Sequence, residues 1–203
     1  MTPLTLHSER NVIRLQLKQN VILEGLGDED WAELEPYLRI VDTGKGDYLV
    51  SQGVHEMGQY FILDGILKRA VSNKDGKEMI LRFAGEREME TSYAAWRLGT
   101  RTPYGILSVT KARVAHMPLP EWVAFLAKRP QVKELFEYHV MEVMSEIMAH
   151  TITLHLLDAP GRVQRFQRKH PEFFERIPRK ELASHLNLSA ETLSRLRHSG
   201  KIP

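Results

Sequence analysis

The spacing of hydrophobic positions changes twice along this 203-residue chain. In residues 4–38, leucines and a tryptophan recur at helical spacing, which predicts short helices. From Ile40 to Met117, short apolar runs are separated by glycines, which predicts many short strands. Helical periodicity returns after Pro118. Strands followed by helices indicate a mixed α+β chain, with expected units at residues 1–117, 118–158 and 159–203.

Regular turns in the strand region favour an antiparallel roll or barrel. Tyr60–Leu63 and Ile66–Val71 flank the tight turn Asp64-Gly65, which predicts a hairpin. Asn73–Gly76 predicts a second hairpin with the run that ends at Phe83. Because no long helix separates these runs, antiparallel pairing is favoured over a parallel α/β sheet.

The strongest periodic signal lies in residues 118–158. Seven positions are separated alternately by four and three residues, as in a coiled-coil seam: Phe136, Val140, Val143, Ile147, His150, Leu154 and Leu157. We expect a long dimerisation helix that pairs with a second copy in a parallel two-fold dimer. The alternative is a core helix lying on the roll, because further residues widen the apolar surface, namely Leu135, Met141, Met144 and Met148. The two arrangements are compatible with each other.

The end of the chain, from Arg179 onward, predicts a helix-turn-helix. Two short helices meet at a turn that is too brief to let them run antiparallel, and such a corner suits docking in a DNA groove. Ser189 is expected to cap the second helix, residues 189–199. An apolar stripe is expected to hold the pair together, formed by Leu182, Ala183, Leu186, Leu188, Leu193 and Leu196.

The outer face of the second helix is nearly all polar. A carboxylate accepts from cytosine N4 and an arginine donates twice to guanine, so Glu191 and Arg195, one turn apart, suit neighbouring base pairs. The alternative is a solvated face on which the same two residues form an ion pair. The expected DNA-binding residues are Arg179, Lys180, Ser189, Glu191, Thr192, Arg195, Arg197 and His198.

The charge distribution favours the DNA interpretation. The whole chain has a formal net charge of +2, yet after Gly161 ten basic residues stand against four acidic ones, a net +6. The preceding residues therefore carry −4. A basic segment attracts phosphate irrespective of base sequence. Double-stranded DNA is thus the first expected partner.

Several other chemistries find no support. The chain has no cysteine, which excludes disulfides and thiolate metal sites. Its histidines lack the close spacing of a metal site, and no nucleophile elbow, phosphate loop or His-Glu-x-x-His helix occurs, so we expect no enzyme, no cofactor and no metal. No apolar stretch approaches the length of a membrane span, and a cytoplasmic location without membrane contact is expected.

These features together resemble the bacterial cyclic-AMP receptor protein and fumarate-nitrate regulator (Crp/Fnr) family. The resemblance rests on residues 177–196, which include the helix-turn-helix, and on Lys45–Gly53 at the entry to the roll. It implies a cyclic-nucleotide-binding-like roll, a double-stranded β-helix, and a homodimeric transcription regulator that reads a palindromic site. In the family, Glu and Arg occupy the places of Glu191 and Arg195. Ala190 stands where a well-studied member has another arginine, so the preferred operator is expected to differ.

Two departures from the family pattern affect the expected function. Cyclic-nucleotide binders hold the phosphate with a Gly-Glu and an Arg-Ser/Thr pair, of which Glu90, Arg101 and Thr102 remain, while Met89 replaces the glycine. A less polar effector in the roll, or none, therefore fits better than a cyclic nucleotide. The wing that usually follows the recognition helix is also expected to be truncated, since only Gly200–Pro203 follow. The alternative function is a ligand-binding sensor of the same fold that has lost DNA binding.

Overall fold

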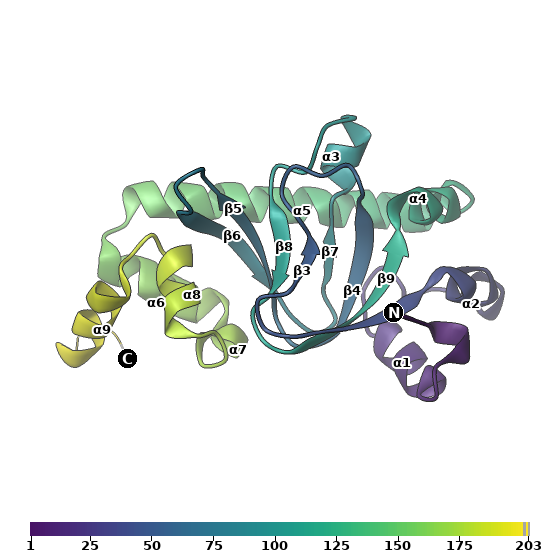
Figure 1. Cartoon of the computed structure of the whole chain (residues 1–203), viewed down its shortest axis with the longest axis horizontal. Helices are drawn as coiled ribbons and strands as arrows, with labels where there is room; N and C mark the ends of the chain where they lie inside the picture. Colours follow the sequence, from purple (N-terminus) through teal and green to yellow (C-terminus); the bar gives the residue numbers. More distant parts are fainter. Residues whose placement is uncertain (201, 203) are drawn as a thin grey trace.

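The computed structural model describes residues 1–200 and 202, and confirms the expected α+β class with an antiparallel roll (Figure 1). One sheet has the order β1-β2-β9-β4-β7 and the other the order β3-β8-β5-β6, with antiparallel pairing throughout. The strands are β1 Thr2–Pro3, β2 Arg39–Thr43, β3 Tyr48–Val50, β4 Gly58–Asp64, β5 Leu67–Ser72, β6 Glu78–Ala84, β7 Met89–Thr91, β8 Gly105–Ser108 and β9 Ala112–Pro118.

Helices lie at both ends of the roll and along one side. Figure 1 shows the long helix α5 running the length of the molecule, with α1 and α2 near one end of the roll and the carboxy-terminal helices at the other. Among the described residues, no helix has the length and apolar character needed to cross a membrane. The helices are α1 Arg10–Leu17, α2 Asp28–Leu34, α3 Tyr93–Arg97, α4 Leu119–Ala127, α5 Pro130–Leu156, α6 Ala159–Lys169, α7 Pro171–Phe174, α8 Arg179–His185 and α9 Ala190–His198, with 3-10 turns at Leu4–Leu6 and Glu35–Tyr37.

One of the two predicted hairpins is wrong. β5 and β6 pair across the Asn73–Gly76 turn as expected. β4 and β5, although joined by the tight turn at Gly65, belong to different sheets, since β4 pairs with β7 and β9 while β5 pairs with β6 and β8. Gly65 has φ +88°, and a Cβ there would lie 2.4 Å from the Lys111 carbonyl oxygen. The turn therefore passes the chain from one sheet to the other, at a point that only glycine tolerates.

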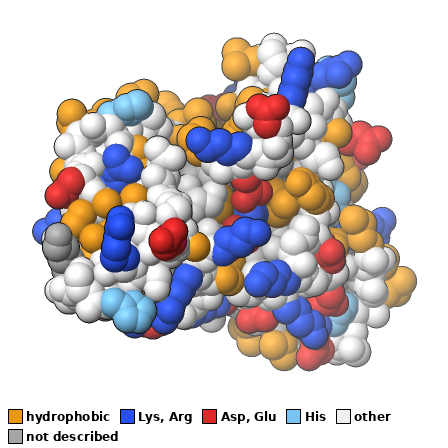
Figure 2. Space-filling model, turned by 60° about the vertical axis from the view of Figure 1, so that its left-hand side comes forward, with side chains coloured by type: hydrophobic (Ala, Val, Ile, Leu, Met, Phe, Trp, Pro, Cys, Tyr) orange, Lys and Arg blue, Asp and Glu red, His pale blue; other side chains and the backbone are white. Residues whose placement is uncertain are grey.

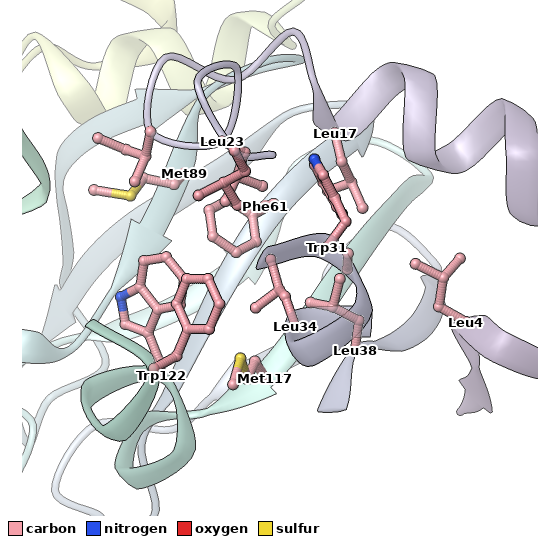
Figure 3. Packing of buried hydrophobic residues seen from close by; sticks show 14 of the residues in the cluster. Leu4, Leu17, Leu23, Trp31, Leu34, Leu38, Phe61, Met89, Met117 and Trp122 are labelled. Carbon is pink, nitrogen blue, oxygen red and sulfur yellow. The ribbon is translucent and has the colours of Figure 1, made fainter. Parts of the chain in front are cut away.

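The main apolar core joins the amino-terminal helices, the roll and the start of α5. Trp31 and Trp122 are both fully buried there, and Figure 3 shows them with leucines from the first helices around Phe61 of β4. Phe136 of α5 is fully buried and meets Trp122 edge to face at 5.4 Å. This packing anchors the first half of α5 to the roll.

The predicted seam on α5 lies against the chain's own roll, which corrects its assignment as the dimer surface. Phe136 is 0% exposed and Val143 is 7% exposed within the single chain, so neither is available to a partner. Val140 packs on the main core, and Ile147, His150 and Leu154 are partly buried. The face of α5 that carries the predicted seam therefore fits the alternative given above, a core helix lying on the roll. Leu157 lies just after the helix and is 37% exposed.

The opposite face of α5 carries an exposed apolar stripe. Its members recur every three or four residues over the 27-residue helix, as on one face of a helix. Each is between 45% and 76% exposed: Tyr138, Met141, Met144, Met148, Ile152 and Leu156. A continuous apolar stripe of this length is uncommon on the surface of a monomeric protein.

A second apolar cluster joins the helix-turn-helix to the roll. It combines Ile80 and Phe83 of β6 with Leu182 of α8 and Leu196 of α9, all buried. Gly85 at the end of β6 permits this contact, because a Cβ there would lie 2.6 Å from the Phe173 ring. The carboxy-terminal helices and the roll therefore share one continuous core.

Candidate nucleic-acid interface

The helix-turn-helix corner is formed as the sequence predicts. α8 ends where Asn187 adopts φ +53°, a left-handed conformation that asparagine tolerates better than most residues. The Leu188 amide then donates to the Ala183 carbonyl at 2.9 Å, which closes the end of the helix. The predicted apolar stripe is buried, with Leu188 partly so: Leu182, Ala183, Leu186, Leu193 and Leu196.

Ser189 caps α9, as predicted. Its hydroxyl oxygen accepts from the Thr192 amide at 3.0 Å and donates to the Thr192 hydroxyl at 2.9 Å. Glu191 follows in the first turn, where the helix dipole favours an acidic group. The two hydroxyls are thus engaged in holding the start of the helix.

The outer face of α9 is open. Glu191, Arg195, Arg197 and His198 are exposed, and His198 bonds back to the Ser194 carbonyl at 2.8 Å. Within residues 1–200 and 202, Glu191 and Arg195 form no ion pair with each other or with another residue, so the solvated ion pair considered as an alternative is not formed.

Basic side chains continue beyond α9. Arg179 and Lys180 are exposed at the start of α8 and have no ion-pair partner among the described residues. Figure 2, which brings the carboxy-terminal helices forward on the left, shows Lys and Arg side chains spread over this end with few acidic ones. The face is suited to contact with a polyanion.

The first helix of the motif is bonded to the roll. Lys68 of β5 donates to Glu181 of α8 at 2.7 Å and to Glu78 of β6 at 2.6 Å. Burial opposes the charge of Lys68, but hydrogen bonds to the two carboxylates prevail and raise its pKa. Ser184 donates to the Glu78 carbonyl at 3.1 Å. Sequence reasoning did not identify the contacts of α8 with the roll, because their partners, Lys68 with Glu181 and Glu78 with Ser184, lie more than a hundred residues apart.

A histidine pair completes this contact. His185 of α8 is buried, and its Nδ1 lies 3.0 Å from the Ile80 carbonyl, which can only accept a hydrogen bond. His150 of α5 stacks on it at 3.8 Å and donates from Nε2 to the His185 carbonyl at 3.0 Å. Burial, with His150 nearby, lowers the pKa of His185 to about 3, so the ring is neutral at pH 7.

The predicted effector residues do not form one site. Glu90 is fully buried, and its carboxylate lies 2.6 Å from Arg69 Nη2 and 3.4 Å from Arg82 Nε. Arg101 is exposed and bonds to His55 at 3.2 Å. Thr102 donates to the Ser51 carbonyl at 2.9 Å. The three side chains thus engage three separate sets of partners.

The space between the roll and α5 is nearly filled. The cavity there, lined by Arg69, Arg82, Tyr104 and Val143 among others, measures about 10 Å³. That volume holds about one water molecule. An effector between the roll and α5 would require this region to open.

The remaining expectations concern metals and the carboxy terminus. Residues 1–200 and 202 contain no group of three His, Asp or Glu side chains placed to hold a metal ion. The expected truncated wing, at Gly200–Pro203, falls partly on residues 201 and 203, which lie outside the described residues. Ile202 is buried in the second apolar cluster.

Comparison with known proteins places the fold. No protein-family model and no curated protein sequence matches the chain. Solved structures do: the global regulator CLP of Xanthomonas campestris, described as c-di-GMP responsive, has TM-score 0.70 at 14% identity, covering 86% of this chain and 93% of CLP. A putative Crp/Fnr regulator of Eubacterium rectale has TM-score 0.71 at 15% identity, and the match covers 89% of this chain and 87% of that regulator. FixK2 of Bradyrhizobium japonicum has TM-score 0.68 at 16% identity, and the match covers 80% of this chain and 86% of FixK2.

These likenesses define the class of fold. A roll, a long helix and a carboxy-terminal helix-turn-helix occur in this order along the chain, and the three structures named above, which cover most of it, are described as regulators or come from the Crp/Fnr family. The chain has the fold of the Crp/Fnr regulators, as its resemblance to that family implies.

Proposed function

We propose that this chain is a DNA-binding transcription regulator that acts as a homodimer and reads a palindromic site through α9. The observation that carries the proposal is the open outer face of α9, where Glu191, Arg195 and Arg197 are exposed and unpaired among the described residues. A recognition helix needs such donors and acceptors for base edges. The net positive charge after Gly161 supplies attraction to phosphate.

The second copy pairs through the exposed stripe of α5. Helix α5 is about 40 Å long, and the stripe faces away from the roll along most of it. A stripe that meets its own copy about a two-fold axis buries both at once. The two α9 helices then enter successive major grooves about 34 to 36 Å apart.

DNA binding is tested by selecting bound duplexes from a random pool with the full chain. We expect palindromic enrichment, and a steep fall of affinity with salt. Arg195→Ala should relax one base position by about 1 to 3 kcal/mol of discrimination. Arg101→Ala, which removes an exposed arginine of the roll, is the control and should leave selection unchanged. Absence of salt-dependent duplex binding would instead support a sensor that has lost DNA function.

Pairing is tested by sedimentation of Met148→Glu, which places a charge in the middle of the stripe. We expect a shift from dimer to monomer and weaker binding to a full palindrome, because two half-sites no longer act together. Val12→Glu makes the same kind of change at a residue of α1 that is 57% exposed, and should remain a dimer. Unchanged mass for Met148→Glu would place the pairing surface elsewhere.

A further inference from the structure

A cavity lies where the roll, α5 and the carboxy-terminal helices meet. It measures about 60 Å³, larger than the filled space inside the roll. Phe83 of β6, Ile147 of α5 and Phe166 of α6 contribute apolar walls. Because each of the three parts supplies lining residues, the shape of this joint cavity depends on how the helix-turn-helix sits on the roll.

The charges around the joint cavity do not cancel. Its lining includes Arg82, Arg162, Arg165 and Lys169 but only two carboxylates. One carboxylate, Glu146, pairs with Lys169 at 2.9 Å, and the other, Glu88, with Arg82 at 3.2 Å. Both acidic groups are therefore already engaged.

Two of the arginines keep an uncompensated charge. Arg162 donates to the carbonyls of Leu157 at 2.9 Å and Leu186 at 3.2 Å, which orients it without neutralising it. Arg165 has neither an ion pair nor a hydrogen bond among the described residues. The cavity thus offers positive charge beside an apolar wall.

A buried donor in the same lining also lacks a partner. The Arg82 side chain is 9% exposed, and its Nη1 makes no hydrogen bond in the structure. Buried polar groups are almost always bonded, so the unpartnered nitrogen of a side chain that lines both this cavity and the small one between the roll and α5 points to a missing acceptor. An anion supplies both the acceptor and the opposite charge.

We propose that the joint cavity binds a small organic acid, a carboxylate with a short apolar body, and that binding strengthens the contact between the helix-turn-helix and the roll. The carboxylate meets Arg82 and Arg165, and the apolar body lies against Phe83 and Ile147. An inorganic anion would match the charge but leave the apolar wall uncovered.

The regulatory half of this proposal rests on the proposed DNA function. An acid that touches the roll, α5 and α6 together binds the docked arrangement better than any arrangement that separates them. If DNA favours one arrangement, acid and DNA change each other's affinity by the same factor. Binding of the acid itself requires no DNA.

The binding test is calorimetry with the full chain at constant ionic strength. The probes are acetate, propionate, butyrate and valerate, with inorganic phosphate and chloride for comparison. We expect saturable binding that strengthens with chain length until the acid outgrows the cavity. Equal binding of phosphate, or no saturable binding of any carboxylate, would overturn the assignment.

Three variants separate the site from general charge effects. Arg165→Ala should weaken binding about tenfold or more, as expected for loss of a charged hydrogen-bond partner. Arg168→Ala, an exposed arginine of the same helix that does not line the cavity, is the matched control. Ala149→Phe fills the cavity without changing charge and should abolish binding while the thermal transition remains cooperative. Unaltered binding in both Arg165→Ala and Ala149→Phe contradicts the site.

Coupling is measured by repeating DNA titrations with the selected duplex at saturating acid. A changed DNA affinity in the wild type, absent in Ala149→Phe, supports regulation through the joint cavity. Acid binding with unchanged DNA affinity overturns the regulatory half alone. Acid binding without any DNA binding contradicts the proposed function and leaves the ligand site standing.

Discussion

The two halves of α5 meet the rest of the protein in different ways. In the first half, Phe136 is fully buried among Trp122 and Tyr93, and the neighbouring Glu90 is enclosed by arginines. In the second half, His150 is only partly buried and touches α8 through one stacked ring and one hydrogen bond, beside an open cavity. Dense packing fixes the first half on the roll, whereas the second half reaches α8 through these two contacts, beside the apolar cluster that joins α8 and α9 to β6.

This contrast indicates where the molecule can change shape. Closely packed apolar contacts rarely tolerate a second arrangement, but polar contacts at a joint have alternatives in water. The first half of α5 is fixed on the roll, and the proposed acid would act beside the second half, where the joint cavity lies.

The largest effect is expected from Phe136→Ala. The substitution leaves a cavity in the main core and should lower the free energy of unfolding by about 3 to 5 kcal/mol. Chemical denaturation followed by far-UV circular dichroism measures it. Leu98→Ala, at a residue that is 76% exposed, is the control and should cost less than about 0.5 kcal/mol. A loss at Phe136 no greater than that of the control would mean that α5 is not anchored there.

The next largest effect is expected from Glu90→Gln. The change leaves Arg69 as a buried cation without its carboxylate and leaves Arg82 with Glu88 alone, and removing one partner of a buried ion pair costs about 3 kcal/mol or more. The same denaturation experiment measures it, with Glu24→Gln at an exposed position as the control. A stability equal to that of the wild type would show that the buried ion pairs of Glu90 do not stabilise the roll.

Local signals in the sequence predicted local structure well. Ser189 and the leucines around it predicted the helix-turn-helix, because a cap and an apolar stripe act within a few residues. The Asn73–Gly76 turn predicted the β5–β6 pairing for the same reason. Of the side chains expected to bind DNA, Glu191, Arg195, Arg197 and His198 lie exposed on α9, and Arg179 and Lys180 lie exposed at the start of α8.

Features that depend on distant contacts escaped prediction. The turn at Gly65 resembled a hairpin, but which sheet each strand joins is decided by strands β7, β8 and β9 further along the chain. The periodicity of α5 revealed an apolar face without revealing what covers it, and the helix is apolar on two faces. Glu90 matched a family motif, yet Arg69 and Arg82 reach it from other strands.

The sequence does contain a signal for the proposed site in the joint cavity, although it was not used to predict that site. Arg162, Arg165 and Lys169 are spaced three and four residues apart, so they share one face of α6 beside the joint cavity. In the sequence they counted only toward net charge. A basic stripe on a helix that precedes a helix-turn-helix is a separate cue, because it lies outside the helix proposed to read DNA.

A smaller effect is expected at the other half of α5, from His150→Ala. The variant loses the ring stacked on His185 and the hydrogen bond to its carbonyl, which should cost about 1 to 2 kcal/mol. Hydrogen exchange should show the loss in α8 and not in the main core. His155→Ala, an exposed histidine of the same helix, is the control. Faster exchange spread evenly over the chain would contradict a separable joint.

The smallest effect is a dependence on pH that originates at His185. Its ring faces His150 on α5 and His170 after α6, and burial holds its pKa near 3, whereas an unfolded histidine titrates near pH 6.5. Between these values the unfolded chain binds the extra proton, so stability falls as the pH drops. From pH 7 to pH 6 this group alone should cost about 0.7 kcal/mol.

His185→Asn isolates that contribution. Its side-chain amide is able to donate to the Ile80 carbonyl in place of Nδ1, and it does not titrate. Burial also lowers the pKa of His150 and of His170, so the variant keeps part of the slope. Denaturation at pH 7 and pH 6 should show a shallower slope for His185→Asn than for the wild type. Equal slopes would mean that His185 is reached by water, and that the joint is open for much of the time even without a ligand.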